Sequence, residues 1–181
     1  MKLTVVLHNI RSTYNVGAIL RTAEGFGVEK VILSGYTPWY DKPGLLPHLA
    51  EKLEHQITKT AVGADKLVKT EWVEDLPAWL DNLPEDVQKL GLENNLEDDR
   101  LKTLGDFTFD DKLSELKSLA YEEEKSNYTD EKVLVLGEEV HGIPPEVLAK
   151  LDVLLEIPMR GRKESFNVSV AAGIAIYELM R

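Results

Sequence analysis

The chain has 181 residues, no cysteine and a formal net charge of −11. This length suits one domain with a sizeable core, and the lack of cysteine excludes disulfides, thiolate catalysis and cysteine-based zinc sites. The negative charge argues against a general nucleic-acid coat, because phosphate neutralisation requires clustered Lys and Arg, although a local basic site stays compatible with it. The first apolar run soon meets His8 and Asn9, too early for a signal peptide or membrane span, so we expect a cytosolic protein.

The acidic residues are concentrated in one stretch of the chain. Residues 94–131 hold 12 Asp and Glu against 5 Lys and Arg, and this net charge of −7 leaves only −4 for the rest of the chain. Leu113, Leu116 and Leu119 predict one short amphipathic helix within it, whereas the composition fits a disordered segment or a mobile lid equally well. We therefore expect a solvated, insertion-like segment at about 94–131.

The first third of the chain predicts a βαβ unit. Residues 3–7 are typical of a buried strand, residues 16–26 of a helix with Asn15 as its N-cap, and residues 30–33 of a second short strand. This order predicts a parallel sheet with a right-handed crossover. The elements expected next are a loop at 36–46, a helix at 47–60 and a strand at 67–73.

The second half predicts more strands and a long final helix. Residues 132–136 are the clearest buried strand, and a stripe of small and apolar residues along 168–179 indicates a helix that Ser165 or Asn167 can cap. Together these elements predict an α/β fold, a mostly parallel sheet with helices on both faces. The other expected elements are a helix at 75–89 disturbed by Pro84, a short strand at 90–92, a helix opened by Pro144 and Pro145, and a strand at 153–157.

Three polar clusters follow predicted strands. Ligands of open parallel sheets bind beyond the carboxyl ends of the strands, so this topology gathers the clusters at one edge. Hydroxyl, amide and cationic side chains beside glycine-containing turns suit a polar or anionic ligand. The clusters are Asn9, Arg11, Asn15, Gly17 and Arg21; then Gly137, Glu138, Glu139, His141 and Gly142; and then residues 160–167.

Each of these side chains also has an ordinary structural interpretation. Arg21 can be a surface residue paired with Glu24, Glu139 can be a solvated carboxylate, and Ser165 and Asn167 can be helix caps alone. No dinucleotide fingerprint, P-loop, nucleophile elbow or zinc-protease motif occurs, which disfavours a dinucleotide enzyme. The 4 histidines show no metal-ligand spacing, so no metal is expected.

Taken together, the clusters resemble the three motifs of the SpoU/TrmH-type RNA ribose 2′-O-methyltransferases, a branch of the SPOUT class. All three occur in the family's order, and the match is good over residues 1–75 and 132–181 and poor over residues 76–131. The motifs are Asn9-x-Arg11 with Asn15-x-Gly17-x-x-x-Arg21-Thr22-Ala23, LVLGEEVHGI at 134–143, and Ile157-Pro158-Met159 leading to SFNVSVAAG at 165–173.

The resemblance implies a single SPOUT methyltransferase domain over residues 1–181, whose C-terminal part forms a trefoil knot that binds S-adenosylmethionine. It implies methylation of a ribose 2′-hydroxyl in tRNA or rRNA by a homodimer whose active site is completed across the interface, with the first helix and the helix from Val168 supplying much of the contact. The implied cofactor site is apolar, rich in glycine and poor in charge. Its residues are Leu136, Gly137, Ile157, Met159 and Phe166.

Matched motif by motif, Arg21 corresponds to the catalytic arginine of the family. Because a guanidinium is effectively always protonated in proteins, we assign Arg21 to orienting the 2′-hydroxyl and stabilising the incipient oxyanion, while a substrate phosphate helps to accept the proton. The supporting catalytic residues implied by the resemblance are Asn15, Glu139, Ser165 and Asn167.

We expect no RNA-binding extension before Met1 or after Arg181, where some relatives carry basic segments. RNA recruitment is therefore expected to depend on local cations, with Lys59 or an accessory protein as further help, and to be weak and steeply salt-dependent. One alternative is a non-catalytic cofactor-binding or RNA-binding protein of the same fold that docks a basic partner through its acidic segment. Another, a doubly wound metabolite enzyme, lacks its phosphate-binding fingerprint. The cations expected to bind RNA are Arg11, Arg160, Arg162 and Lys163.

Overall fold

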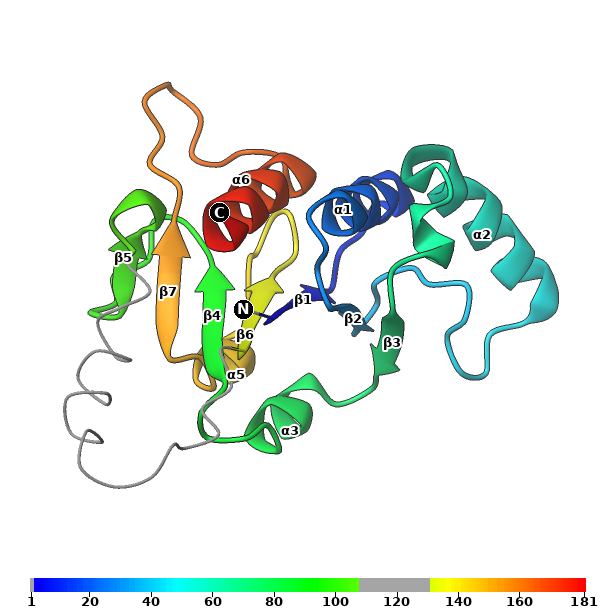
Figure 1. Ribbon diagram of the computed structural model, residues 1–181, viewed down its shortest axis with the longest axis horizontal. Helices are drawn as coiled ribbons and strands as arrows, with labels where there is room; N and C mark the ends of the chain where they lie inside the picture. Colours follow the sequence, from blue (N-terminus) through cyan, green and yellow to red (C-terminus); the bar gives the residue numbers. More distant parts are fainter. Residues whose placement is uncertain (1, 108–130) are drawn as a thin grey trace.

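The computed structural model describes residues 2–107 and 131–181. Its strands form one sheet of seven, and every neighbouring pair runs parallel, which confirms the predicted parallel sheet (Figure 1). The strands are β1 (Lys2–His8), β2 (Lys30–Ser34), β3 (Thr70–Val73), β4 (Gln88–Leu92), β5 (Leu101–Thr103), β6 (Glu131–Leu136) and β7 (Val153–Glu156). Their order across the sheet is β3-β2-β1-β6-β4-β7-β5.

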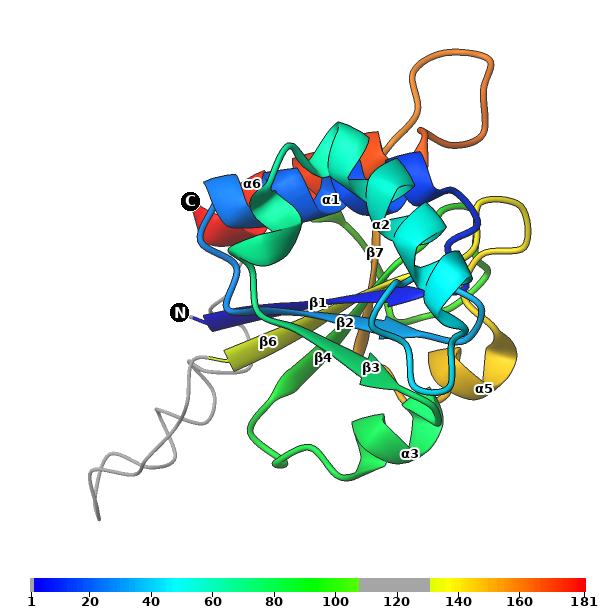
Figure 2. The same ribbon diagram turned by 90° about the vertical axis from the view of Figure 1, so that its right-hand side faces the viewer.

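Helices cover both faces of this sheet, as predicted. The described helices are α1 (Thr13–Gly25), α2 (Pro47–Ala61), α3 (Leu76–Asp81), α5 (Pro145–Leu148) and α6 (Val168–Met180), with 3-10 turns η1 (Ala64–Lys66) and η2 (Leu104–Asp106). Helices α1, α2 and α6 lie on one face, and α3 and α5 lie on the other (Figures 1 and 2). No helix in the described ranges is long and apolar enough to cross a membrane.

The central strands β1 and β6 are mostly apolar because both of their faces are covered. Successive side chains of a strand point to opposite faces, so Val5 packs into the core beneath α1 and α6 whereas Val6 packs into the core beneath α3 and α5. Both side chains are fully buried. This two-sided burial explains why residues 133–136 are a continuous apolar run.

The first helix packs closely against its two neighbours. A Cβ atom added to Gly17 would lie 2.9 Å from the backbone nitrogen of Ala61, so only glycine lets α1 approach α2 this closely. On the other side, a Cβ atom added to Gly173 of α6 would lie 3.9 Å from Cγ2 of Thr22, an ordinary contact distance. Ala172, Ala175, Ile176 and Leu179 of the predicted stripe are buried, which confirms the stripe as the packing face of α6.

One of the two predicted helix N-caps is confirmed and the other is wrong. The prediction that Asn15 caps the first helix was wrong: α1 begins at Thr13, and the hydroxyl of Ser12 accepts a hydrogen bond of 3.4 Å from the backbone N–H of Asn15. At the start of α6, Asn167 is the N-cap as predicted, and its Oδ1 accepts from the backbone N–H of Ser169 at 2.9 Å. The side chain of Asn15 is thus available for other contacts.

The expected helix at 75–89 was too long. Asp75 caps α3 by accepting from the backbone N–H of Ala78 at 3.0 Å, but the helix ends at Asp81. Pro84 disfavours helical backbone at the residue before it and supplies no N–H. The chain then enters β4 at Gln88, two residues before the predicted strand. Similarly, the strand predicted at 67–73 begins only at Thr70, because η1 precedes it.

Part of the expected acidic insertion belongs to the sheet. Residues 101–103 form β5, which pairs with β7, and Leu104 is buried. Arg100 anchors this edge, since its Nη1 donates to the carbonyls of Leu148 and Leu151 at 3.0 and 2.7 Å. Its hydrogen bonds to Asp98 lower the pKa of that carboxyl to about 2. The helix predicted around Leu113, Leu116 and Leu119 lies outside the described residues.

Candidate active site

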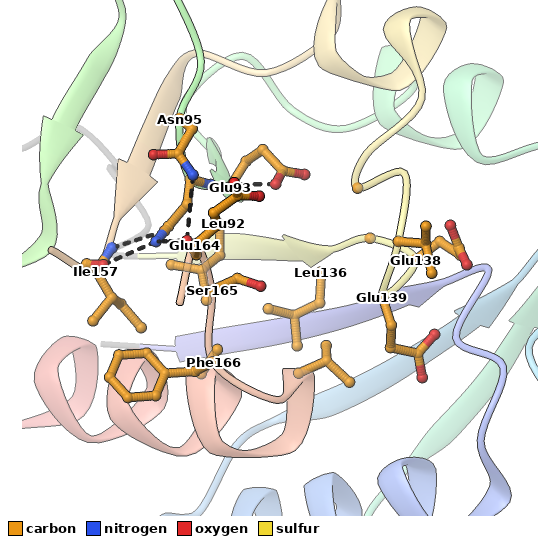
Figure 3. A pocket seen from close by; sticks show the side chains of 16 residues that line it. Leu92, Glu93, Asn95, Leu136, Glu138, Glu139, Ile157, Glu164, Ser165 and Phe166 are labelled. Atoms are coloured by element: carbon orange, nitrogen blue, oxygen red, sulfur yellow. Dashed lines mark hydrogen bonds between the residues drawn. The ribbon is translucent and has the colours of Figure 1, made fainter. Parts of the chain in front are cut away.

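The carboxyl ends of β6, β4 and β7 surround a pocket of about 290 Å³ (Figure 3). The second and third polar clusters line it directly, and the first cluster reaches it through Glu139, as described below. The predicted convergence at one sheet edge is therefore confirmed. The lining residues are Leu92, Glu93, Asn94, Asn95, Leu136, Gly137, Glu138, Glu139, Val140, Gly142, Ile157, Glu164, Ser165, Phe166, Val168 and Ala171.

A tight backbone loop after β6 forms one wall of the pocket. The backbone groups of Glu138 and Gly142 exchange two hydrogen bonds, of 3.0 and 2.9 Å, and Gly142 has a φ of +72°. A Cβ atom added to Gly137 would lie 2.5 Å from the backbone nitrogen of Ile143, closer than real Cβ contacts. The glycines of the second motif are thus required by backbone packing, and the loop presents main-chain groups to the pocket.

Glu138 stabilises this loop from within. Its carboxylate is almost fully buried and accepts from the backbone N–H and the Nδ1 of His141, both at 2.7 Å. The guanidinium of Arg11 lies 3.6 Å from its other oxygen. Burial opposes ionisation, but the hydrogen bonds from His141 outweigh it and hold the pKa of Glu138 below its ordinary value. Arg11, predicted to bind RNA, therefore also neutralises a buried carboxylate.

Three of the predicted catalytic residues, one from each motif, form a connected hydrogen-bond chain. Asn15 donates from Nδ2 to Oε1 of Glu139 at 2.9 Å, and Asn167 donates from Nδ2 to Oδ1 of Asn15 at 3.3 Å. The other oxygen of Glu139 accepts from the backbone N–H of Arg11 at 3.1 Å. We call Arg11, Asn15, Glu139 and Asn167 the Glu139 network. It excludes the interpretation of Glu139 as an isolated solvated carboxylate.

Two other predicted catalytic residues stand apart from this network. Arg21 lies further along α1, is exposed, and makes no hydrogen bond or ion pair with any residue in the described ranges, including Glu24. Ser165 lines the pocket, and its hydroxyl has no partner among the described residues. The cap of α6 is Asn167, so Ser165 has no capping role. Both side chains are available to a ligand.

Four of the five residues predicted to bind the cofactor line the pocket. Leu136, Gly137, Ile157 and Phe166 line it, whereas Met159 does not and lies half-buried in the loop beyond β7. Figure 3 shows Ile157 and Phe166 at one end of the pocket and Glu138 and Glu139 at the other end. Leu136 lies between these two ends. The predicted RNA-binding cations Arg160, Arg162 and Lys163 are exposed on the same loop, outside the lining.

Sequence reasoning missed the residues that follow β4. Asn94 clamps Ile157, accepting from its N–H at 3.1 Å and donating to its carbonyl at 2.9 Å. Glu93 accepts from the backbone N–H of Ile143 at 2.8 Å, and Asn95 donates to the carbonyl of Glu164 at 3.3 Å. The sequence did contain a signal, because these three polar residues directly follow the strand predicted at 90–92. Asn94 and Asn95 were instead assigned to the insertion-like segment at about 94–131.

The charge of the pocket also differs from the expectation of a site poor in charge. Within the described residues, its lining includes the carboxylates Glu93, Glu138, Glu139 and Glu164 and no Lys, Arg or His. The walls beside them are apolar, notably Leu92, Leu136 and Ile157. Such a pocket favours a ligand with an apolar body and a positive charge.

Asn9, the first residue of the first motif, has a structural role. It adopts a φ of +61°, its Oδ1 accepts from the backbone N–H of Tyr36 at 3.1 Å, and its Nδ2 lies 3.1 Å from Nε2 of His8. The Nδ1 of His8 lies 2.7 Å from the hydroxyl of Ser34. Burial lowers the pKa of His8, which suits a neutral ring held by these contacts. Asn9 therefore ties the ends of β1 and β2 together.

Comparison with known proteins agrees with this geometry. Residues 2–177 match the SpoU rRNA Methylase family, and the chain belongs to that family. It is 31% identical over 179 residues to the tRNA (guanosine(18)-2′-O)-methyltransferase of Aquifex aeolicus, covering 99% of this chain and 69% of that protein. It is also 31% identical to the 23S rRNA (guanosine-2′-O-)-methyltransferase RlmB of Coxiella burnetii, covering 99% of this chain and 58% of that protein.

The fold is shared with solved structures. The AdoMet-bound rRNA methyltransferase from Sinorhizobium meliloti superposes with a TM-score of 0.72 at 21% identity, covering 98% of this chain and 55% of that one. At this identity the likeness concerns the fold alone. The chain spans between 55% and 69% of the length of these three proteins.

Proposed function

We propose that the chain is an S-adenosylmethionine-dependent RNA methyltransferase that modifies a ribose 2′-hydroxyl in tRNA or rRNA. The observation that carries this proposal is the chain of hydrogen bonds joining Asn15, Glu139 and Asn167, one residue from each motif, beside the pocket. Family membership supports it, since the two relatives named above are 2′-O-methyltransferases of tRNA and 23S rRNA.

The pocket suits S-adenosylmethionine by the chemistry of its walls. Leu136, Ile157 and Phe166 offer apolar surface to a nucleoside, and the loop at 137–142 offers main-chain hydrogen-bonding groups. The carboxylates Glu93 and Glu139 suit a cationic ligand. When bound, the cofactor supplies a methyl group on a positively charged sulfur. Met159 lies outside the lining, so we leave it out of the proposed cofactor-binding set.

We assign the 2′-hydroxyl to Arg21. Its guanidinium cannot act as a base, because it stays protonated, but it can donate hydrogen bonds to the 2′-oxygen as negative charge develops there. Glu139 and Asn15 hold the first turn of α1 against the pocket loop, which positions the helix that carries Arg21. Ser165 and Arg11 are assigned as anchors of the ribose or a phosphate, with the substrate phosphate helping to accept the proton.

A homodimer is part of the same proposal. Helix α6 is buried on one face, yet Val170, Ile174 and Tyr177 expose 49%, 37% and 53% of their surface on the other. Their spacing of four and three residues places them on one stripe, and the ring of Phe26 from α1 lies 5.9 Å from that of Tyr177. A second copy of the chain would cover this apolar stripe. Light scattering on the purified protein tests the dimer, with Val170→Glu expected to dissociate it.

The C-terminal trefoil knot remains a proposal. It is supported by the path of residues 157–167, which leave β7, pass the side chains of Asn94 and Asn95, and return to α6 against α1. Figure 1 shows this loop in orange beyond the carboxyl ends of β4 and β7. A knot restricts the way in which α6 can reach its place, so refolding from denaturant should be slow and should slow further when Asn94 is replaced by Ala.

The experiment that tests the activity is methyl transfer from radiolabelled S-adenosylmethionine to bulk tRNA and, separately, to rRNA. Nuclease digestion then locates the label. Label in a 2′-O-methylated nucleotide that disappears with Arg21→Ala is the expected result and identifies the RNA class. Cofactor binding measured by calorimetry, without transfer to either RNA, would overturn the proposal. The cytosolic location and an accessory protein stay predictions, and nothing in the described residues favours the non-catalytic alternative.

A further inference from the structure

A second, open cavity of about 410 Å³ lies between the start of α1 and the exposed side of α2. On α2, His48, Lys52, His55 and Lys59 recur at spacings of four, three and four residues, which places them on one helix face. Tyr14 of α1 closes the other side, with 53% of its surface exposed. We call this cavity the α2 trough. It is lined by Tyr14, His48, Glu51, Lys52, His55, Gln56 and Lys59.

Three side chains of the α2 trough have no partner among the described residues. Lys52, Lys59 and the hydroxyl of Tyr14 make no hydrogen bond or ion pair with any residue in the ranges 2–107 and 131–181, and all three side chains are exposed. Long cationic side chains that lie free around a concave surface are available to an external anion.

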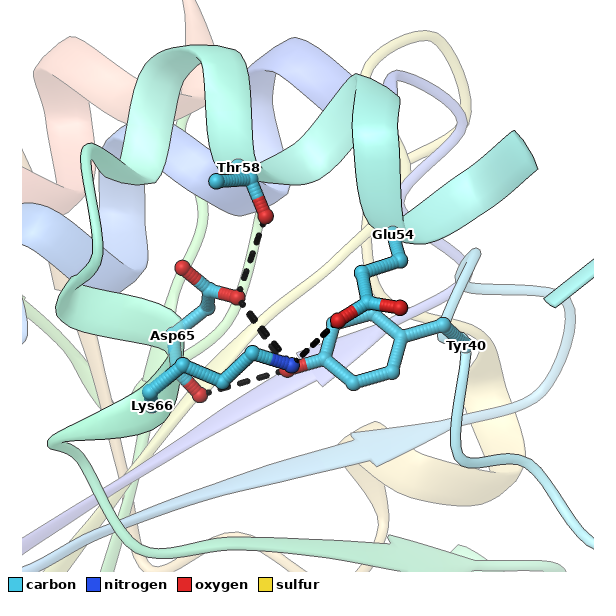
Figure 4. Close-up of polar contacts among 5 residues, drawn as sticks. All are labelled: Tyr40, Glu54, Thr58, Asp65 and Lys66. Atoms are coloured by element: carbon cyan, nitrogen blue, oxygen red, sulfur yellow. Dashed lines mark hydrogen bonds and ion pairs between the residues drawn. The ribbon is translucent and has the colours of Figure 1, made fainter. Parts of the chain in front are cut away.

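The adjacent polar face of the same helix behaves differently (Figure 4). Glu54 forms an ion pair of 2.6 Å with Lys66, and Thr58 donates to the buried carboxylate of Asp65 at 3.3 Å. Tyr40 donates to the same oxygen at 3.2 Å. We call Tyr40, Glu54, Thr58, Asp65 and Lys66 the Asp65 cluster. On this face, the polar side chains of α2 have partners. The lack of partners for Lys52 and Lys59 among the described residues is therefore specific to the trough face.

The α2 trough is held rigidly next to the candidate active site. Tyr14 immediately precedes Asn15, whose side chain bonds to Glu139 at the pocket. The hydroxyl of Thr60 donates to the carbonyl of Tyr14 at 3.0 Å, so the same turn of α1 is tied to α2. The close approach at Gly17 reinforces this contact. An extended ligand that reaches from the pocket to the α2 trough would therefore pass Tyr14.

The charge of the trough identifies the kind of ligand. Lys52 and Lys59 against Glu51 leave a net charge of +1 there, in a chain whose net charge is −11. Cations that contact phosphates, next to an aromatic ring on which a base can stack, are the combination by which proteins bind single-stranded nucleic acid. A duplex keeps its bases stacked inside, so the exposed ring of Tyr14 favours an unpaired segment.

We infer that the α2 trough binds the single-stranded RNA segment that flanks the methylated nucleotide, with one base stacked on Tyr14 and the backbone phosphates on Lys52 and Lys59. This inference rests on the proposed function for the identity of the RNA. It assigns substrate recognition to α2, and not to the loop cations at 160–163 alone.

Binding of a fluorescein-labelled oligouridine of about 12 nucleotides tests the inference without requiring catalysis. The double variant Lys52→Ala/Lys59→Ala should bind on the order of tenfold more weakly, and its plot of log affinity against log salt should be shallower by about 1.4. The matched control Lys69→Ala/Lys150→Ala removes the same charge from two surface ion pairs near the amino ends of β3 and β7, and should bind like the unmodified protein.

Substitutions of Tyr14 separate stacking from charge. Tyr14→Ala should weaken binding about tenfold with an unchanged salt slope, and Tyr14→Phe should bind normally because it keeps the ring. Equal losses in the trough and control variants would show a non-specific charge effect and overturn the inference, as would unchanged binding in the trough variants. Trough-dependent binding without methyl transfer would overturn the proposed function alone, and transfer with trough-independent binding would overturn the inference alone.

Discussion

The Asp65 cluster and the Glu139 network are both dense groups of polar side chains, but they differ in burial and in what surrounds them. The side chain of Asp65 is fully buried, and its partners Tyr40, Thr58 and Lys66 belong to α2 or to the segments next to it. The Glu139 network is half exposed, joins segments up to 152 residues apart, and adjoins a pocket whose lining includes Ser165, a side chain with no partner among the described residues.

The difference teaches that polar density alone does not indicate a functional site. Burial raises the pKa of Tyr40 and keeps its hydroxyl protonated as a donor to Asp65. Asp65 even retains an oxygen, Oδ1, without a partner among the described residues, a costly arrangement that the surrounding fold sustains. Such a cluster stabilises α2. Donors and acceptors that stay available next to a cavity indicate a binding site.

The largest effect is expected at Arg21. Its replacement by Ala or by Lys should lower the rate of methyl transfer by at least about 10²–10³-fold, the usual effect of removing one donor to a developing oxyanion. The melting temperature and the cofactor affinity should hardly change, because the side chain is exposed and unpaired within the described ranges. Single-turnover methyl transfer and calorimetry measure the two. Turnover retained by the Lys variant would contradict the assignment.

Replacement of Asp65 is expected to lower the stability of the fold without directly changing the pocket. Asp65→Ala should lower the free energy of unfolding by about 2–3 kcal/mol, since it removes the buried oxygen that accepts from both Tyr40 and Thr58. Urea unfolding measures this change. Cofactor binding of the folded variant should be normal, and Glu54→Gln, at an exposed ion pair of the same cluster, serves as a control with a much smaller loss.

The N-cap of α1 provides a smaller stability effect close to the site. Ser12→Ala should lower the free energy of unfolding by about 1 kcal/mol, because the backbone N–H of Asn15 loses its acceptor. Ser12→Asp should restore it. If both variants unfold like the unmodified protein, Ser12 has no role as a cap.

The smallest effect concerns the pH dependence contributed by Glu138. Its pKa is lowered in the folded protein, so its contribution to stability is present above the ordinary Glu pKa of about 4.3 and is lost as the pH falls through the lower, folded value. Glu138→Gln should therefore be less stable than the unmodified protein at pH 6, and the two should converge as the pH falls below about 4. Urea unfolding across this range tests it, and a difference that persists at low pH would show a purely steric cause.

Local patterns were enough to predict the elements that build the site. The apolar run of β1 and the small-residue stripe of α6 both lie where expected, and Asn167 caps α6. Each of these features depends on residues within a few positions of one another, so periodicity and capping preferences detect them. The motifs containing Asn15 and Glu139 likewise indicated the correct edge of the sheet.

Tertiary structure alone decided which residues meet. Asn94 clamps Ile157 because β4 lies between β6 and β7 and brings together groups 63 residues apart. The α2 trough forms only because Gly17 lets two helices approach until Tyr14 faces Lys52 and Lys59. Hydrogen bonds and cavities of this kind depend on packing across the fold, and no local pattern of residues records them.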